Sequence, residues 1–306
     1  MAAFLPLWRF QPAGKQVLER TSIMKRSARP ILSLDRFELF AVVAFLAVVA
    51  TGVWLRAHQS SDPMQSAGEN PVQSAGELES FKNKYGPNHY SEREEEWLIR
   101  DYFADRRGGV FVDVGANHYQ DASKTYYLER NLGWSGIAVE PQRQFAADYE
   151  RHRPLTRFRP FFVSNVSNET ARLYVTKQSS LVASGDKQFV QQFGPLDEIR
   201  DVPTITLNDL LTAEGIQRID FLSIDIELHE PQALAGFDIK RFRPSLVCIE
   251  GLLPVRQQIL DYFAANDYVL VGKYMWVDLE NLYFVPRGEQ PPQSTTASLA
   301  ARDGAH

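Results

Sequence analysis

The sequence contains a single cysteine, Cys248, among its 306 residues. One thiol cannot form an intrachain disulfide, and it cannot supply the several thiolates that a zinc cluster or an iron–sulfur site requires. Basic residues are not in excess either, because the formal net charge is -5 and the sequence pI is about 5.8. Such a chain has no overall attraction for a phosphate backbone, so we expect no nucleic-acid partner.

Glycine is scarce where a dinucleotide-binding turn would require it. The stretch VFVDVGANHY, residues 110–119, reads as a buried strand followed by a sharp turn, and Gly115 is its one glycine. A pyrophosphate needs three glycines in such a turn to approach the backbone, whereas Ala116, Asn117 and His118 follow here. A nicotinamide-dependent oxidoreductase is therefore disfavoured.

The same turn suits a ligand that ends in an amino acid instead of a phosphate. Asp113 offers a carboxylate for an ammonium group, and Asn117 or the backbone offers donors for a carboxylate. S-adenosylmethionine has such an end. The alternative is an ordinary strand-to-helix turn in which Asp113 caps the helix.

One apolar run is long enough to cross a bilayer. Residues 37–55, FELFAVVAFLAVVATGVWL, reach about 28 Å as a helix. A buried helix or a cleaved signal peptide fits less well, because the run is apolar on every face and a long basic arm precedes it. We therefore expect a basic arm at 1–36, a transmembrane helix at 37–55, a flexible linker at 56–80, a folded domain at 81–287 and a disordered tail at 288–306.

The flanks of this run predict its orientation. The arm before it carries seven basic and two acidic residues, whereas Arg56 alone follows directly after it. Because basic residues stay on the cytoplasmic side, we expect a single-pass membrane protein with an extracytoplasmic domain. Asn165 and Asn168 would then be glycosylation candidates in a eukaryotic host. The cytosolic synthesis of S-adenosylmethionine is an argument for the opposite orientation.

Strand-like and helix-like segments alternate through the domain, which predicts a mainly parallel sheet with helices on both faces. The expected strands are residues 109–114, 135–140, 157–164, 219–225 and 245–250. The expected helices are residues 123–133, 143–152, 207–215 and 254–268. Two strand-like runs with no helix between them, within residues 268–287, predict a terminal antiparallel hairpin of the kind that class I methyltransferases have.

Two further groups of acidic residues follow expected strands. Glu140 closes the strand after the Gly115 turn, where a carboxylate can accept hydrogen bonds from vicinal ribose hydroxyls. Asp225, Glu227 and His229 follow the strand at 219–225 and can bind, orient or deprotonate an acceptor hydroxyl. In the structural alternative, Glu230 is a helix-terminus carboxylate and Asp225 forms a salt bridge.

Five motifs in register resemble the FkbM-type methyltransferase family. They are FVDVGAN, LERNLGWSGIAVEP, VPTITLNDLL, IDFLSIDIELHEPQALAGF and PSLVCIE, between residues 110 and 250. The resemblance implies a Rossmann-like class I methyltransferase fold, dependence on S-adenosylmethionine, and a hydroxyl acceptor on a glycan or a secondary metabolite. It matches Asp113, Gly115 and Asn117 to the donor turn, Glu140 to the ribose carboxylate, and Asp225, Glu227 and Glu230 to the acidic motif.

Two positions depart from the family pattern. The family usually has a lysine two residues before the aspartate and a glycine after the first glutamate, where this chain has Ser223 and Leu228. These departures favour an alternative in which the chain is a catalytically altered or inactive binding protein at the membrane. Retention of Asp113, Gly115 and Glu140 argues against it.

The chemistry of the acceptor side stays open at the level of sequence. A protonated alcohol is a poor nucleophile, so Asp225, Glu227 or His229 would act as a base. Alternatively, Asp225 and Glu250 would hold a divalent cation that lowers the pKa of the hydroxyl, and oxygen ligands favour magnesium or calcium.

Overall fold

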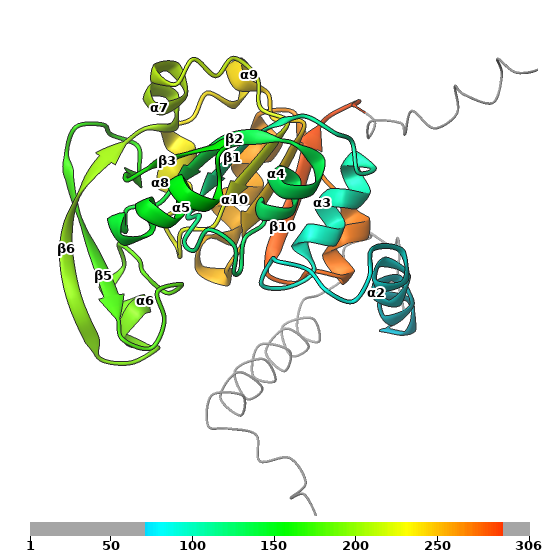
Figure 1. Ribbon diagram of the computed structural model, residues 1–306, viewed down its shortest axis with the longest axis horizontal. Coiled ribbons are helices and arrows are strands. Elements are labelled where there is room, and N and C mark those ends of the chain that lie inside the picture. The colour runs from blue at the N-terminus through cyan, green and yellow to red at the C-terminus, as the bar shows by residue number, and fades with distance from the viewer. Residues whose placement is uncertain (1–70, 290–306) are drawn as a thin grey trace, which may run out of the picture. The chain divides into compact units, whose positions relative to one another are not determined.

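A computed structural model of the chain describes residues 71–289 (Figure 1). The predicted transmembrane helix at 37–55, the basic arm and nearly all of the predicted tail lie outside the described residues. Within residues 71–289, no helix is long and apolar enough to cross a membrane.

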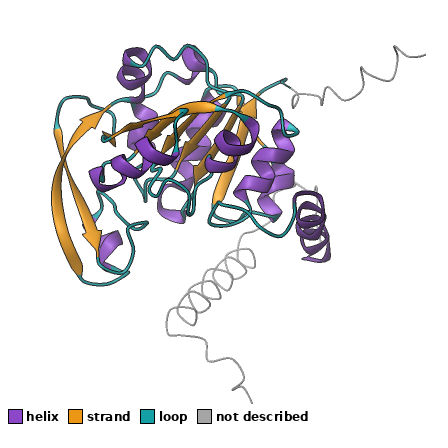
Figure 2. Ribbon diagram, in the orientation of Figure 1, coloured by secondary structure: helices purple, strands orange, loops and turns teal. Residues whose placement is uncertain are grey.

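A seven-stranded sheet forms the centre of the domain (Figure 2). Its strand order is β3-β2-β1-β7-β8-β10-β9, in which the first five strands are parallel and β10 is antiparallel to both neighbours. The expected parallel sheet with a terminal antiparallel hairpin is therefore confirmed, although a short 3-10 helix, η2 (Gly272–Trp276), lies between the hairpin strands. The strands are β1 (Val110–Val114), β2 (Ser135–Val139), β3 (Thr156–Arg159), β7 (Phe221–Ile224), β8 (Leu246–Glu250), β9 (Tyr268–Leu270) and β10 (Asn281–Pro286).

Helices cover both faces of this sheet. Alternate strand residues point to opposite faces, so Val112 contributes to one core and Phe111 to the other. The Val112 core includes side chains from α7 (Leu207–Ala213), α8 (Glu230–Ala235) and α10 (Leu253–Ala265), whereas the Phe111 core includes α3 (Glu95–Phe103) and α4 (Tyr126–Leu132). The remaining short helices are η1 (Arg143–Phe145), α5 (Ala146–His152) and α9 (Ile239–Phe242).

The expected strand at 157–164 is wrong, because the segment divides between two sheets. β3 ends at Arg159, and β4 (Phe162–Val163) pairs with β6 (Leu196–Ile205) in a separate three-stranded sheet. Pro160 stands at the break, where it fixes φ and lacks the N–H that a continuous ladder needs.

We call residues 162–205 the β arm. It contains β4, β5 (Thr170–Thr176), α6 (Lys187–Gln191) and β6, and the β5–β6 ribbon stands beside the main sheet in Figure 1. Phe162, Leu173, Val175 and Val202 form its own small core. No pattern in the sequence predicted this arm.

A helix crosses the predicted boundary between linker and domain. Helix α2 (Pro71–Tyr85) includes residues 71–80, which were expected to be flexible. Leu78 and Phe81 are partly buried against the Phe111 core, and this apolar contact explains why a polar segment folds as a helix. The folded domain therefore begins before Phe81.

Candidate active site

The predicted site residues gather at one edge of the main sheet. β1 lies between β2 and β7, so the strand order reverses at β1. In open α/β sheets, ligands bind outside the carboxyl ends of the strands at such a reversal. Gly115, Glu140 and Asp225 all follow strand ends at this edge, and Glu250 ends β8.

The turn after β1 is packed directly against the end of β7. Gly115 has φ 83°, and a Cβ atom at this position would lie 1.7 Å from the carbonyl oxygen of Asp225. Only glycine fits such a close approach. Asn117, with φ 44°, also adopts the left-handed conformation that asparagine tolerates. The single glycine of this turn is thus required by the fold, whatever ligand binds there.

Glu140 is connected to the same turn. Its carboxylate accepts hydrogen bonds from the backbone N–H groups of Asn117 (3.2 Å) and Gln142 (2.9 Å). The side chain is 4% exposed, and burial raises its pKa to about 7. The Ser180 carbonyl of the β arm accepts hydrogen bonds from the side-chain amides of Asn117 (2.8 Å) and Gln142 (3.0 Å). The arm therefore covers this part of the sheet edge.

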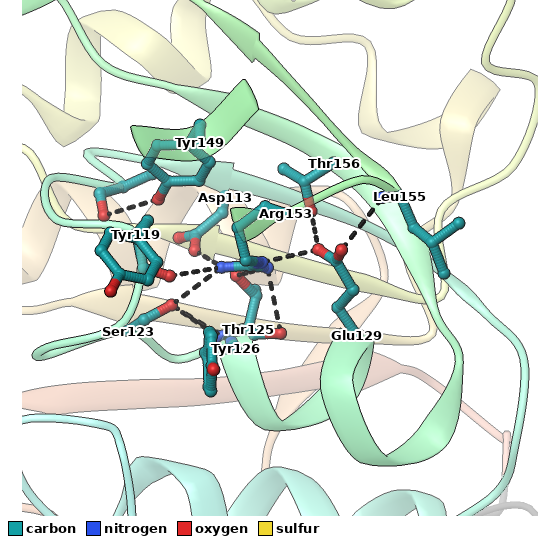
Figure 3. A network of polar contacts seen from close by, with 11 residues as sticks. Asp113, Tyr119, Ser123, Thr125, Tyr126, Glu129, Tyr149, Arg153, Leu155 and Thr156 are labelled. Atoms are coloured by element: carbon teal, nitrogen blue, oxygen red, sulfur yellow. Dashed lines mark hydrogen bonds and ion pairs between the residues drawn. The ribbon is translucent and has the colours of Figure 1, made fainter. Parts of the chain in front are cut away.

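Asp113 lies inside a buried polar network (Figure 3). Its carboxylate accepts a hydrogen bond from the Thr125 hydroxyl at 2.8 Å, and burial raises its pKa. The side chain is 4% exposed. These contacts explain Asp113 without a ligand, and its expected role at the donor ammonium stays a prediction.

Arg153 is the centre of that network. Its guanidinium donates to Glu129 (2.6 Å), to the Tyr119 carbonyl (2.9 Å) and to the carbonyl and hydroxyl oxygens of Thr125 (both 3.2 Å). Glu129 also accepts from the Leu155 N–H at 2.9 Å and from the Thr156 hydroxyl. The network holds the loop between β1 and α4 against the start of β3, as Figure 3 shows.

Three carboxylates meet on the other side of the strand reversal. Asp225, Glu227 and Glu250 each present an oxygen, and these oxygens lie within 4.8 Å of one another. Burial raises the pKa of Glu227 to about 9, and repulsion from Asp225 and Glu230 is the second-largest cause. Burial and the same kind of repulsion raise the pKa of Glu250 well above its ordinary value. The cluster thus contains more acidic groups than it can hold ionised without a cation.

Lys124 supplies a cation to this cluster. Its ammonium lies 2.5 Å from a carboxylate oxygen of Asp225, and the lysine side chain is 8% exposed. Burial opposes the charge, but attraction by Asp225 and other acidic groups outweighs it and holds the pKa of Lys124 well above its usual value. Asp225 therefore forms the salt bridge that the structural alternative predicted, with Lys124 as its partner.

The neighbouring Glu230 is fully buried at the start of α8. Its Oε1 accepts a hydrogen bond from the Ile226 N–H at 3.0 Å, as expected of a carboxylate at a helix terminus. Its Oε2 has no partner in the described part of the chain. Burial raises the pKa of Glu230 to about 7.

His229 faces the β arm. Its Nε2 lies 3.2 Å from the Ser164 hydroxyl, and its ring meets the Phe162 ring edge-on at a centroid distance of 4.6 Å. Burial lowers its pKa to about 4, so the imidazole is neutral at neutral pH. Ser184 of the arm also donates to the backbone carbonyl of Glu227 at 2.6 Å. The arm thus forms one wall beside the acidic cluster.

The two departures from the family pattern have different structural settings. Ser223 is 1% exposed on β7, and its hydroxyl has no hydrogen-bond partner among residues 71–289. Leu228 has φ 76° directly after Glu227 with φ 56°, a conformation that favours glycine. Packing of Leu228 against the Val112 core compensates for this strain.

Sequence reasoning missed Lys124, Arg153 and the Ser180 loop. Residues 123–133 read as a helix, whereas α4 begins only at Tyr126 and leaves Lys124 in the preceding loop. A lysine close to Tyr126 and Tyr127 was the one available signal in the sequence, but nothing local connects it to Asp225, 101 residues away.

Comparisons with known proteins agree with these motifs. The model of the methyltransferase FkbM domain matches residues 113–270, just over half of the chain. No curated protein matches the chain.

The chain is also similar to solved methyltransferase structures at low identity. A methyltransferase from Geobacter sulfurreducens is 10% identical with a TM-score of 0.35, over 78% of this chain and 97% of that one. The O-methyltransferase from Bacillus cereus, in complex with SAH, is 12% identical with a TM-score of 0.36, over 77% and 96%. Methyltransferase FkbM from Methylobacillus flagellatus is 9% identical with a TM-score of 0.33, over 70% and 59%. On the extent of the family match, this chain belongs to the FkbM methyltransferase family.

Proposed function

We propose that this protein transfers the methyl group of S-adenosylmethionine to a hydroxyl oxygen of a small molecule or a glycan. One observation carries the proposal. The turn after β1 contacts Glu140 on one side, through Asn117, and the backbone of Asp225 on the other, through Gly115. A ligand at this edge would contact both the Glu140 carboxyl, which suits ribose hydroxyls, and the acidic cluster.

On the donor side, Glu140 would accept hydrogen bonds from the ribose hydroxyls. Each of its oxygens already accepts one backbone N–H and retains a second lone pair for a hydroxyl. Because Glu140 is 4% exposed, the Ser180 loop must move when the nucleoside enters. The amides of Asn117 and Gln142, which hold that loop, would then be free to bind the donor.

On the acceptor side, His229 is the best candidate for the base. Glu227, with a pKa of about 9, is protonated at neutral pH, and one Asp225 oxygen is bonded to Lys124. His229 is neutral and can accept a proton, and its lowered pKa of about 4 makes it a weaker base than an ordinary histidine. The acceptor oxygen attacks the methyl carbon, the carbon–sulfur bond breaks, its electron pair stays on sulfur, and the hydroxyl proton passes to the base.

Donor binding by the full-length protein tests this function. We expect S-adenosylhomocysteine to bind in isothermal titration calorimetry and NAD not to bind. Replacing Glu140 by Ala should weaken binding by about 1.5–3 kcal/mol, because a charge-assisted hydrogen-bond acceptor is lost. Glu150→Ala, an exposed glutamate on α5, is the matched control. Unchanged affinity in Glu140→Ala would remove Glu140 from the site, and NAD binding would favour an oxidoreductase.

We further propose that residues 37–55 anchor the domain to a membrane and that the domain is extracytoplasmic. The asymmetry of basic residues around this run supports the orientation. Asn165 and Asn168 are exposed on the β arm, so a glycan would be accommodated there. Protease treatment of intact cells or sealed vesicles tests this: a domain that stays protected on the cytosolic side contradicts the orientation.

A further inference from the structure

Lys124 is a buried ammonium surrounded by acidic side chains. Asp225 is its direct partner at 2.5 Å, and its charge also lowers the pKa values of Glu95, Glu227 and Glu250 against the opposing effect of burial. Glu95 is 3% exposed, and its own hydrogen bonds come from the Arg93 N–H and the Asn281 amide. The ammonium thus pairs directly with Asp225 and lies in the same buried cluster as several other carboxyl groups.

The three carboxylates at the sheet edge resemble a site for a hard divalent cation. Their oxygens lie within 4.8 Å of one another, and carboxylate oxygens are the ligands that magnesium and calcium prefer. However, an oxygen of Asp225 is already bonded to the ammonium. A divalent ion on Asp225 would lie beside a buried like charge, and repulsion between such charges is strong where water is excluded.

Hydrogen bonds hold the residues on either side of Lys124. Thr125 donates to Asp113 and accepts from Arg153, and the Ser123 hydroxyl accepts from the Tyr126 N–H at 3.1 Å. Lys124 therefore stands between two residues that the Arg153 network holds in place, as Figure 3 shows for Ser123 and Thr125. Its side chain reaches Asp225 from a buried, hydrogen-bonded segment.

We propose that Lys124 is the resident cation of this site and takes the place of a divalent metal. Its ammonium orients the Asp225 carboxylate and balances the acidic cluster, which makes Lys124 a positioning residue for the methyl-transfer site. This inference rests on the proposed function, because that function is what makes the cluster a methyl-transfer site. The exclusion of metal by Lys124 is nevertheless measurable without any methyl transfer.

Manganese binding to the full-length protein tests the proposal. The electron paramagnetic resonance signal of free Mn²⁺ reports binding directly. We expect the wild-type protein to bind Mn²⁺ at this site no more tightly than about 1 mM. Lys124→Met removes the charge at similar length and should tighten binding at least about tenfold, because the three carboxylates then lack a cation. Lys124→Arg keeps the charge and should behave as the wild type.

Further variants separate this site from other acidic surfaces. Lys124→Met combined with Asp225→Asn should lose the gained Mn²⁺ binding, and Lys240→Met, an exposed lysine on α9, should show no gain. If Lys124→Met does not fold by circular dichroism, Lys124→Gln retains a donor to Asp225 and makes the same test. Submillimolar binding by the wild type that Glu250→Gln abolishes would overturn the proposal, as would a folded neutral variant that gains no binding.

Calorimetry on the same samples separates the two proposals. Wild-type affinity for S-adenosylhomocysteine should be equal in EDTA and in millimolar magnesium. A protein that binds neither S-adenosylhomocysteine nor Mn²⁺ would contradict the proposed function while the role of Lys124 as resident cation would stand. Binding of the donor product only when metal is present would overturn the role of Lys124 alone.

Discussion

Arg153 offers the sharpest test of how the domain holds the loop between β1 and α4. Its side chain is 1% exposed, and its guanidinium donates to Glu129, Tyr119 and Thr125. Arg153→Met would keep much of the volume but leave the buried Glu129 carboxylate without its cation. Breaking a buried ion pair from one side costs about 3–5 kcal/mol, and the loop carbonyls lose their donor as well. We therefore expect the free energy of unfolding to fall by about 3–5 kcal/mol.

Urea unfolding at pH 7, followed by circular dichroism, measures this loss. Arg151→Met, at an exposed arginine two residues earlier, is the control and should change stability by less than about 0.5 kcal/mol. The double variant with Arg153→Met and Glu129→Gln should lose about 1–3 kcal/mol less stability than the sum of the losses in the two single variants. A loss below about 1 kcal/mol in Arg153→Met would refute the view that this network supports the loop.

Two further predictions concern the sheet edge. Gly115→Ala should destabilise the fold by about 2–5 kcal/mol, because the new Cβ would overlap the Asp225 carbonyl and the positive φ adds strain. Gly133→Ala, also at positive φ but with open space around it, should cost only about 1 kcal/mol, and equal losses in urea would contradict the packing argument. Glu230 has its folded pKa raised to about 7 from 4.5, so its contribution to stability is present below pH 4.5 and is lost as the pH rises through 7. Glu230→Gln should therefore gain stability relative to the wild type between pH 4.5 and 8, and parallel pH profiles of urea unfolding would disprove this assignment.

The part of the site that sequence could predict follows from a property of parallel sheets. Gly115, Glu140 and Asp225 each come directly after an apolar strand, and the carboxyl ends of parallel strands share one edge of the sheet. Their convergence needed no knowledge of distant contacts. The roles assigned to these residues stay predictions, since the fold itself already requires Gly115 and gives Asp113 a structural network.

The remainder depends on contacts that no local pattern records. Lys124 and Asp225 are separated by 101 residues, and the value of a lysine at that position depends on three-dimensional packing alone. The β arm was not predicted because Pro160 divides one apolar run between two sheets. Helix α2 was not predicted because its polar composition resembles a linker, and its apolar contact with the core is made by Leu78 and Phe81.

The order of strands in the main sheet also determines when the residues of the site can assemble during synthesis of the chain. β1 is the first strand of the main sheet to leave the ribosome, yet Val110 forms its contact with Asp220 across 110 residues. At about 5–20 residues per second, that partner follows roughly 6 to 20 seconds later. Until then one edge of β1 is unpaired, and the Gly115 turn lacks the Asp225 backbone against which it packs. The turn after β1 is therefore completed late, although its own residues are among the first of the sheet to be made.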